Sequence, residues 1–483
     1  MTTHILTPPV SPTLPRLVLC ADGGGSKVCV VIRSNDGLQV RGVAGPCNVQ
    51  SVGYGPASQS LLLATYRALI QLPKSHLPSA LYIPNLSLSP LSDLRPNTPS
   101  SVYSVGDTGE SSRSARLPNI NMSLFRYAWL GLAGVNCQAD ADGFIGYATS
   151  ALCLTEDEIR LSNDVNLLAA PALAIPGIDH VVAVVAGTGT IGRTIRVSPL
   201  NANPTDSLST LNNIRKRSLP LEDVAISRGW GYLLCDEGSA FWLGRLAIRN
   251  VLSLADRQAS TSVYSSVTPS MLPLHRDILR HFGTTDPAEL INLASLSNGA
   301  FEGSDIGEAT SKRNAMIASA ARVILKWAFP GDNPLGLSGL PTPPASTDGE
   351  SETEAENDME MEVDLESHSD IPNSKSLSHK TTGEILVSRP EEHQMSHLEA
   401  LRLTRKSIIP LIELTESLLG DSTIVKTDKS ALVLGGGLVM SNGYRKLLLD
   451  GLKKENIEFN RILIVDDAAG EGVKALSQIE FGI

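Results

Sequence analysis

One pattern occurs twice in the sequence: a short apolar run, a turn of small residues, and a second run rich in β-branched residues. It covers residues 17–33 (LVLCADGGGSKVCVVIR) and residues 181–195 (VVAVVAGTGTIGRTI). Valine and isoleucine on both sides of a glycine-containing turn predict a β-hairpin in each case. A chain with two such hairpins, each followed by further strands and helices, is expected to fold as two similar α/β halves.

The order of the remaining segments supports this duplication. In the first half we expect strands at residues 16–21, 28–33, 39–43, 127–134 and 158–163, and helices at residues 57–71, 140–152 and 165–174. In the second half we expect strands at residues 180–187, 190–197, 222–228, 430–437 and 461–465, a long helical region before residue 430, and helices after the last two strands. The pattern predicts a duplicated α/β fold with a cleft between two lobes.

The formal net charge of −11 comes almost entirely from one segment of the 483-residue chain. Residues 331–370 contain twelve Asp and Glu residues and no Lys or Arg, which leaves 39 of the 51 acids against 40 bases elsewhere. Aromatic residues make up only 4% of the chain, and no basic stripe with interleaved aromatics occurs. The sequence therefore lacks the electrostatic pattern of a nucleic-acid-binding protein.

Three segments rich in Ser, Pro and Asn or in acids interrupt the periodic pattern, at residues 84–118, 198–220 and 330–397. We expect them to be flexible or disordered inserts, and residues 1–15 to form a disordered tail. In the third insert an acid stands at every second position from residue 350 to residue 366. Unpaired like charges favour a solvated segment, and a role as an acidic docking or phosphorylated segment stays open.

The six cysteines form no CxxC pair, and most lie in apolar runs, which is typical of reduced thiols in the cytoplasm. No run of about 18 apolar residues is present, so neither a membrane span nor a membrane partner is expected.

The glycines of ADGGGSK do not fit the two best-known phosphate-binding turns. A dinucleotide-binding turn and a Walker loop both open a helix, whereas residues 28–32 are a β-branched run. We expect instead that positive φ angles at the glycines turn successive N–H groups inward to bind an anion, with the Ser26 hydroxyl beside them. The alternative is a glycine-rich turn without a ligand.

The second small-residue turn and a third glycine segment strengthen the first interpretation. If the two turns face each other across a cleft, they can hold the β- and γ-phosphates of a nucleotide. The segment ALVLGGGLVMSNG, residues 431–443, is a strand that ends in three glycines before a helix. Its backbone could lie flat against an adenine or a ribose, although a plain strand-to-helix loop has the same sequence.

Two aspartates follow strand patterns. Asp22 could hold Mg²⁺ through the waters of the ion, or could bond only the N–H groups of its own turn. Asp164 could cap a helix, or could accept a proton from a substrate hydroxyl at the carboxyl end of its strand. In the segment RGWGYLLCDEGSAFWLGRLAIR, residues 228–249, Asp236 lies either in a substrate-facing loop or at a helix N-cap, and both roles are compatible.

Together these residues resemble the family of N-acetylglucosamine kinases and the related BadF/BadG/BcrA/BcrD ATPases, within the actin–hexokinase–heat-shock ATPase superfamily. The resemblance covers residues 17–481 apart from the inserts. It rests on the phosphate motifs DGGGSK and AGTGT, the sugar-side motifs PCN, GLAG and ND, and the specific segment GWGYLLCDEGSAFWLG. The family usually has glycine just before DEGS, where this chain has Cys235, a change that bears on substrate choice.

The resemblance implies an α/β fold of two duplicated actin/hexokinase-like (ribonuclease H-like) lobes, residues 16–176 and 177–483. It implies ATP and Mg²⁺ in the cleft and transfer of phosphate to the 6-hydroxyl of N-acetyl-D-glucosamine or a close amino sugar. Asp164 would be the general base, Asp22 the metal-site residue, and Asn48 and Asp236 partners of sugar hydroxyls. The nucleotide would contact Gly23, Gly24, Gly25, Ser26, Lys27, Gly187, Thr188, Gly189, Thr190, Gly435, Gly436 and Gly437, and the sugar would contact Asn48, Asn163, Asp164, Gly229, Trp230, Gly231 and Asp236.

Two other functions remain open at this point. A protein of the same fold could sense nucleotide or sugar without catalysis, although Asp164 and Asp22 favour an active enzyme. An activator-type ATPase would bridge two subunits through an iron–sulfur cluster, but the scattered cysteines offer no paired spacing for one. The expected partners are therefore a sugar and ATP; a homodimer stays open.

Overall fold

The computed structural model describes residues 14–84, 116–197, 219, 221–260, 270–295, 306–332 and 390–483. Most of the predicted inserts and of the predicted tail lie outside these residues. Within the described ranges, no helix combines the length and the apolar character needed to cross a lipid bilayer.

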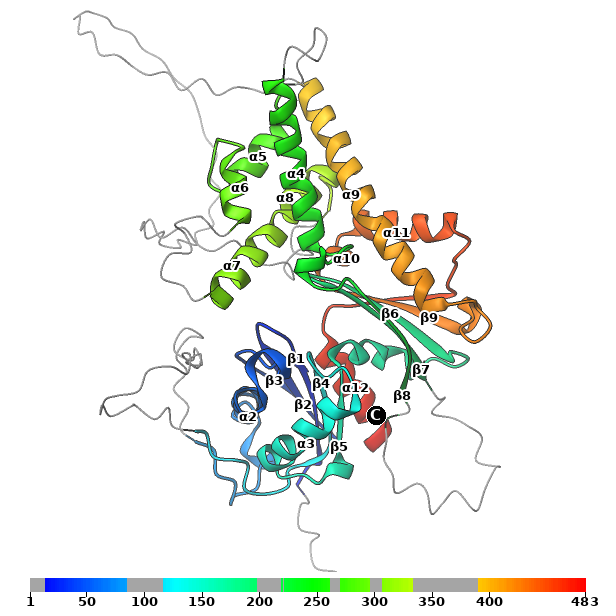
Figure 1. Cartoon of the computed structure of the whole chain (residues 1–483). Coiled ribbons are helices and arrows are strands. Elements are labelled where there is room, and N and C mark those ends of the chain that lie inside the picture. Colours follow the sequence, from blue (N-terminus) through cyan, green and yellow to red (C-terminus); the bar gives the residue numbers. More distant parts are fainter. Residues whose placement is uncertain are drawn as a thin grey trace, which may run out of the picture.

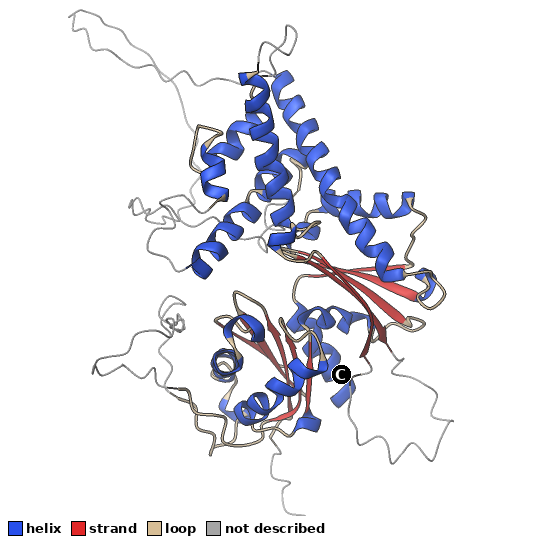
Figure 2. Ribbon diagram, in the orientation of Figure 1, coloured by secondary structure: helices blue, strands red, loops and turns tan. Residues whose placement is uncertain are grey.

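Two five-stranded sheets form the centre of the protein (Figures 1 and 2). The N-terminal half contains β1 (Leu17–Gly23), β2 (Val28–Ser34), β3 (Gln39–Ala44), α1 (Val49–Val52), α2 (Tyr54–Leu69), η1 (Lys74–His76), β4 (Phe125–Leu132), α3 (Gln138–Leu152), η3 (Glu156–Glu158), β5 (Ile159–Ser162) and η4 (Asp164–Ala172). The C-terminal half contains β6 (His180–Ala186), β7 (Thr190–Val197), β8 (Leu221–Arg228), η5 (Tyr232–Leu234), α4 (Ala240–Ala259), α5 (Pro273–His281), α6 (Glu289–Ala294), α7 (Ile306–Ser319), α8 (Ala321–Ala328), α9 (Pro390–Leu419), η8 (Thr427–Lys429), β9 (Ser430–Gly435), α10 (Gly437–Met440), α11 (Asn442–Lys454), β10 (Arg461–Val465) and α12 (Ala468–Phe481).

The strand order repeats between the two sheets. The first has the order β3-β2-β1-β4-β5 and the second the order β10-β9-β6-β7-β8, which is the same order read from the other edge. In each sheet the first three strands pair antiparallel, and the last two run parallel to the first. This duplicated order confirms the predicted fold class.

Strand β1 shows why the first sheet forms in the middle of the lobe. Leu17, Leu19 and Ala21 pack with the apolar side chains of α2 and α3 on one face. Val18 and Cys20 lie on the other face with residues of η4 and α12. Successive side chains of a strand alternate between faces, so a strand buried on both faces has a continuous apolar sequence. This is the property that made the LVLCA run recognisable.

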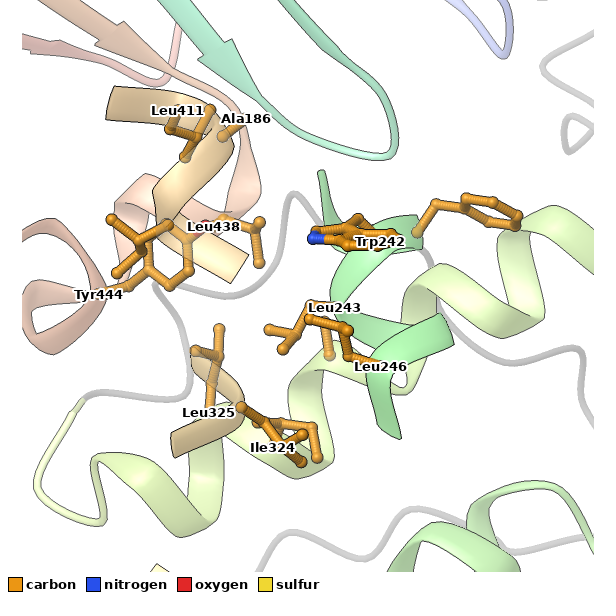
Figure 3. Close-up of a cluster of buried hydrophobic side chains, with 14 of the residues drawn as sticks. Ala186, Trp242, Leu243, Leu246, Ile324, Leu325, Leu411, Leu438 and Tyr444 are labelled. Carbon is orange, nitrogen blue, oxygen red and sulfur yellow. The ribbon is translucent and has the colours of Figure 1, made fainter. Parts of the chain in front are cut away.

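A layer of helices covers the outer face of the second sheet. Its apolar side chains form one buried cluster with Val182, Val184 and Ala186 of β6. Figure 3 shows part of this cluster, in which side chains from α4, α8, α9, α10 and α11 meet: Trp242, Leu243, Leu246, Ile324, Leu325, Leu411, Leu438 and Tyr444. The second lobe is therefore held by long-range contacts between helices far apart in the sequence.

Two helices cross between the lobes. Helix η4 follows β5 of the first sheet yet also contacts β6, β7 and β9 of the second, and α12 follows β10 of the second sheet yet packs on β1, β2 and β4 of the first. In Figure 1 the red helix α12 lies beside the blue strands. An ion pair between Arg126 Nε and Glu480 Oε2, 3.4 Å apart, attaches α12 to β4. Helix α12, which the predicted division at residue 176 assigns to the C-terminal lobe, therefore packs on the first sheet.

Two other predictions need correction. The helix predicted at residues 165–174 is a 3₁₀-helix, Asp164–Ala172, with Pro171 inside it. Proline has no N–H to donate and disfavours a regular α-helix at that point. Helix α9 begins at Pro390, so the predicted end of the third insert at residue 397 is too late.

Candidate active site

The first glycine turn connects β1 and β2. Gly24 N donates to the carbonyl of Lys27 at 2.9 Å, which closes a tight turn. Gly25 and Ser26 are exposed at its tip, and among the described residues their N–H groups have no acceptor. The expectation of positive φ angles is wrong here, because none of the three glycines adopts one. Lack of a side chain matters instead at Gly23, where a Cβ would lie 2.5 Å from Leu132 Cδ2.

The second glycine turn connects β6 and β7 and carries the start of α4. Gly187 N donates to the carbonyl of Gly189 at 3.0 Å, and Ala240 N of α4 donates to the carbonyl of Gly187 at 2.8 Å. Neither glycine has a positive φ, so this turn, like the first, forms without left-handed backbone. The Thr190 hydroxyl Oγ1 is buried and has no hydrogen-bond partner within the described residues. A buried hydroxyl without a partner is costly, which suits a site completed by a ligand.

Asp236 supports the second turn. Its Oδ1 accepts a hydrogen bond of 3.2 Å from Thr190 N. A Cβ on Gly189 would lie 2.6 Å from Asp236 Oδ2, and one on Gly229 would lie 2.3 Å from Oδ1. These two glycines therefore make room for the carboxylate, whose pKa is raised by burial. The N-cap interpretation of Asp236 is wrong, because Ser239 caps α4 by accepting from Trp242 N.

The third glycine segment lies directly on the second turn. Gly436 has a φ of +91°, and a Cβ there would lie 2.6 Å from the carbonyl carbon of Ala186 and 2.8 Å from Gly187 N. Gly435 ends β9, and Gly437 opens α10. The structure thus brings together two glycine segments that are about 250 residues apart in the sequence.

Three carboxylates follow the carboxyl ends of parallel strands. Asp22 belongs to the end of β1, Asp164 follows β5, and Asp467 follows β10. The pKa of Asp22 is raised to about 7, first by burial and then by the negative charge of Asp164, with Asp467 adding to the effect. The pKa of Asp164 is also raised by burial. The two predicted acids therefore share one neighbourhood, and Asp467 is a third member that the sequence analysis did not identify.

Arg193 of β7 lies close enough to Asp164 for its charge to lower the pKa of that carboxyl against the effect of burial. The guanidinium is buried, and its Nη1 donates to Asp223 Oδ2 of β8 at 2.5 Å. Asn166 of η4 donates from Nδ2 to Asp223 Oδ1 at 2.7 Å. Arg193 Nε and Nη2 have no partner among the described residues. This network connects the second sheet to the helix that begins with Asp164.

A cluster of side-chain amides lies next to Asp164. Asn163 Nδ2 donates to Asn136 Oδ1 at 3.5 Å, and Asn136 Nδ2 donates to Gln50 Oε1 at 3.4 Å. Asn48 Oδ1 accepts from Gln50 N at 3.0 Å and lies 2.6 Å from where a Cβ of Gly134 would be, so Gly134 lets this loop approach. Sequence reasoning found Asn48 and Asn163 but missed Asn136 and Gln50, although both are amides within five residues of the quoted PCN and GLAG motifs.

The loop from residue 229 to residue 234 presents large apolar side chains to solvent. Trp230 is 70% exposed with a φ of +68°, and Leu233 is 81% exposed. Gly231 also has a positive φ, of +78°. Such a strained, exposed aromatic fits a surface that a ligand covers better than one that supports the core.

The carboxylates present fit a hydrated metal ion better than a directly bound one. Within the described residues, no three His, Cys, Asp or Glu side chains lie close enough together to ligate an ion directly. Mg²⁺ keeps most of its waters in proteins, and the negative charge that Asp164 places near Asp22 favours a cation there. Asp22 is therefore the residue that would hold Mg²⁺ through water.

Comparisons with known proteins give structural likeness but no sequence relative. No protein-family model matches the chain, and a search of curated proteins finds no match. A candidate N-acetylglucosamine kinase from Chromobacterium violaceum is 17% identical with a TM-score of 0.44, over 96% of this chain and 100% of that one. A candidate N-acetylglucosamine kinase from Porphyromonas gingivalis is 13% identical with a TM-score of 0.49, over 97% and 100%. The hexokinase of Schistosoma mansoni, solved with glucose, is 11% identical with a TM-score of 0.40, over 96% and 86%.

The order of the strands decides the fold. Two sheets with the same order, each followed by a helix that crosses to the other lobe, are the duplicated arrangement expected of this class. The chain has the two-lobe actin/hexokinase-like fold. Its chemistry must be argued from the site, because one fold hosts many functions.

Proposed function

We propose that the protein is an ATP-dependent sugar kinase that transfers the γ-phosphate to the 6-hydroxyl of N-acetyl-D-glucosamine or a close amino sugar. One observation carries the proposal. Asp164 follows directly on Asn163 of the amide cluster and interacts with Asp22 of the first glycine turn. A sugar held by the amides and a phosphate held at the turn would thus meet at one carboxylate.

The amide cluster supplies the groups that a sugar needs. Side-chain amides donate and accept hydrogen bonds, so they can bind hydroxyls in either role. The Asn48 amide nitrogen has no acceptor among the described residues and is free to bind a hydroxyl or an acetamido oxygen. The exposed indole of Trp230 would cover an apolar face of the sugar ring, with Gly229, Gly231 and Asp236 fixing its loop.

The two glycine turns supply the phosphate site. At the first turn, Gly25 and Ser26 offer free N–H groups, and the Lys27 ammonium lies near Asp22. At the second turn, Thr188 and Gly189 form the tip, with the Thr190 hydroxyl behind them. Gly435, Gly436 and Gly437 would lie against the adenosine. Backbone N–H groups aimed at a phosphate stabilise the charge that develops during transfer.

Asp164 would act as the general base. It accepts the proton of the sugar 6-hydroxyl while that oxygen bonds to the γ-phosphorus, and the bond from phosphorus to the bridging oxygen breaks to release ADP. Burial raises the pKa of Asp164, while backbone N–H groups and, after them, the charge of Arg193 act in the opposite direction and favour the ionised base. Mg²⁺, when bound through water at Asp22, would neutralise charge on the phosphates. All six cysteines are unpaired, which fits a reaction in the reducing cytoplasm.

The experiment is a panel of hexoses and amino sugars tested for ADP release, with the phosphorylated carbon of the product assigned by NMR. We expect the highest kcat/KM for an N-acetylated amino sugar and phosphate on carbon 6. Isothermal titration with the same sugars and a non-hydrolysable ATP analogue accompanies it. Tight binding of both ligands without turnover would overturn the kinase proposal in favour of a sensing protein.

A further inference from the structure

A basic groove lies between α4 and α9, outside the candidate active site. It has a volume of about 500 Å³. Four of its lining side chains are cations: Arg249 and Arg257 of α4, and Arg402 and Lys406 of α9. Glu399 is the one acid that lines it. The groove therefore carries an excess of positive charge on the surface of the C-terminal lobe.

Glu399 offsets only one of the four cations, and a hydrogen-bonded chain beneath the groove holds it in place. Leu272 N donates to His275 Nδ1 at 3.2 Å, so the other ring nitrogen, Nε2, carries the proton and donates to Asn250 Oδ1 at 2.8 Å. Asn250 Nδ2 donates to Glu399 Oε1 at 2.7 Å. Burial lowers the pKa of His275 to about 4, so this ring is neutral near pH 7. The network holds Glu399 in position, and its neutral histidine adds no further positive charge to the groove.

Arg402 is the cation that this acid pairs with. Its Nε and Nη2 donate to the two oxygens of Glu399 at 2.8 and 2.6 Å. Arg249 and Lys406 have no acidic partner among the described residues, and Arg257 Nε donates only to the carbonyl of Ser253. Three exposed cations around a preformed groove are a site for a multivalent anion.

The chain itself contains an acidic segment that is close enough in the sequence to reach the groove. From residue 348 to residue 366 every second residue is Asp or Glu. Residues 333–389, which contain this segment, join Asp332 to Pro390, the first residue of α9. The groove residues of α9 lie about 14–24 Å along the helix from Pro390, at 1.5 Å per residue. A random coil as long as the sequence from residue 366 to residue 390 would span about 27 Å on average, so the chain is long enough to reach the groove.

We propose that the acidic segment, residues 348–366, docks in the basic groove of its own chain. Arg249, Arg257 and Lys406 pair with its carboxylates, while the Glu399–Arg402 pair holds the floor in place. The effective concentration of a tethered segment is high, so weak individual ion pairs suffice. The interaction is electrostatic and weakens as salt rises. It does not depend on the activity proposed for the site.

A carbodiimide, which joins an amine to a carboxylate only where the two touch, tests the proposal in the full chain. We expect amide cross-links between Lys406 and residues 348–366 at low salt, identified by mass spectrometry, and their loss near about 0.5 M sodium chloride. Lys74 of η1, an exposed lysine of the other lobe, is the matched control and should form few cross-links with residues 348–366. Because Arg249 and Arg257 are exposed, the variant Arg249→Gln/Arg257→Gln should fold normally and lower the Lys406 yield about threefold to tenfold.

A second variant replaces each Asp and Glu of residues 348–366 by Asn or Gln. In this variant Lys406 should give no more cross-links than Lys74. A mixture of isotope-labelled and unlabelled chains separates docking within one chain from docking between copies. Equal yields at Lys406 and Lys74, or cross-links mainly between copies, would overturn the proposal.

Discussion

Asp467 occupies in the second half of the protein the position that Asp164 occupies in the first. Each is the second residue after the last strand of its sheet, and each stands at the start of a helix that crosses to the other lobe. Their surroundings differ. Asp467 pairs with Arg41 and accepts from Gly470 N at 3.0 Å as the N-cap of α12, whereas Asp164 bonds only the backbone and feels the charge of Arg193. The duplicated position therefore holds an ion-paired, helix-capping acid in one half and, in the other, the buried acid that we propose as the base.

Replacing Asp164 by Asn removes the proposed base while keeping its shape. We expect turnover with sugar to fall by roughly 10² to 10⁴, the usual effect of losing a positioned base. ATP binding, measured by titration with a non-hydrolysable analogue, should stay nearly unchanged. Turnover within a few-fold of the wild type would show that Asp164 is not the base.

Replacing Asp467 by Asn tests the other member of the pair. The amide can still cap α12, but the change removes the ion pair with Arg41 and the negative charge at the helix N-terminus, so we expect the free energy of unfolding to fall by about 0.5–1 kcal/mol in urea denaturation. Turnover at saturating substrates should change far less than in Asp164→Asn. A larger loss of turnover in the Asp467 variant would reverse the roles assigned to the two acids.

The raised pKa of Asp22 predicts a pH-dependent stability. Between the ordinary carboxyl pKa near 4 and the folded pKa of about 7, the native state binds a proton that the unfolded state has lost. The free energy of unfolding therefore falls as pH rises through this window, and the full destabilisation is present above pH 7. Asp22→Asn should flatten this dependence and raise the free energy of unfolding near pH 8. A variant as pH-dependent as the wild type would contradict the assignment.

Arg193 should contribute to the pH dependence of the proposed reaction. Its charge lowers the pKa of Asp164, so Arg193→Gln should raise that pKa and move the acid limb of the kcat/KM profile to higher pH. Asp223→Asn is the control, because it breaks the same ion pair yet keeps the cation. If both variants shift the limb equally upward, Arg193 acts only by holding the structure.

Replacing different glycines by alanine should change the stability of the protein by different amounts. Gly436→Ala places a Cβ against the backbone of Ala186 at positive φ, so we expect a loss of about 1–3 kcal/mol of stability. Gly25→Ala has nothing within 4 Å of the new Cβ and should leave stability within about 0.5 kcal/mol of the wild type. Its KM for ATP should nevertheless rise, because the methyl group stands at the proposed phosphate site. An unchanged KM would remove the first turn from the ATP site.

The sequence predicted the elements that local pattern controls. The hairpins of β1–β2 and β6–β7 and the duplicated order were visible because buried strands are continuous apolar runs. The lobe to which α12 belongs was not visible, since nothing within residues 468–481 says which sheet their apolar face will cover. The positive φ values expected at the first glycine turn were wrong for a similar reason, because a glycine run permits such angles without requiring them.

The acids of the candidate site could be predicted from the sequence, but most of the residues that contact them could not. Asp22 and Asp164 follow strands, and strand ends of one sheet meet at one edge. Asp467 could have been found by carrying the internal repeat through to its last strand. Arg193 and Asp223 could not have been found from the sequence. Their contact joins β7 to β8, and the sequence does not show how these two strands are aligned. Asp236 was assigned to the sugar, yet its observed contact is with Thr190 of the second turn.

The position of α12 has a consequence for synthesis of the chain on the ribosome. One face of the first sheet, which includes Val18 and Cys20, is covered in part by residues that are translated more than 400 positions later. The N-terminal lobe therefore emerges early with an uncovered apolar face and cannot complete its interior until residues 468–481 have been made. Until then this face is open to chaperones and to non-native contacts.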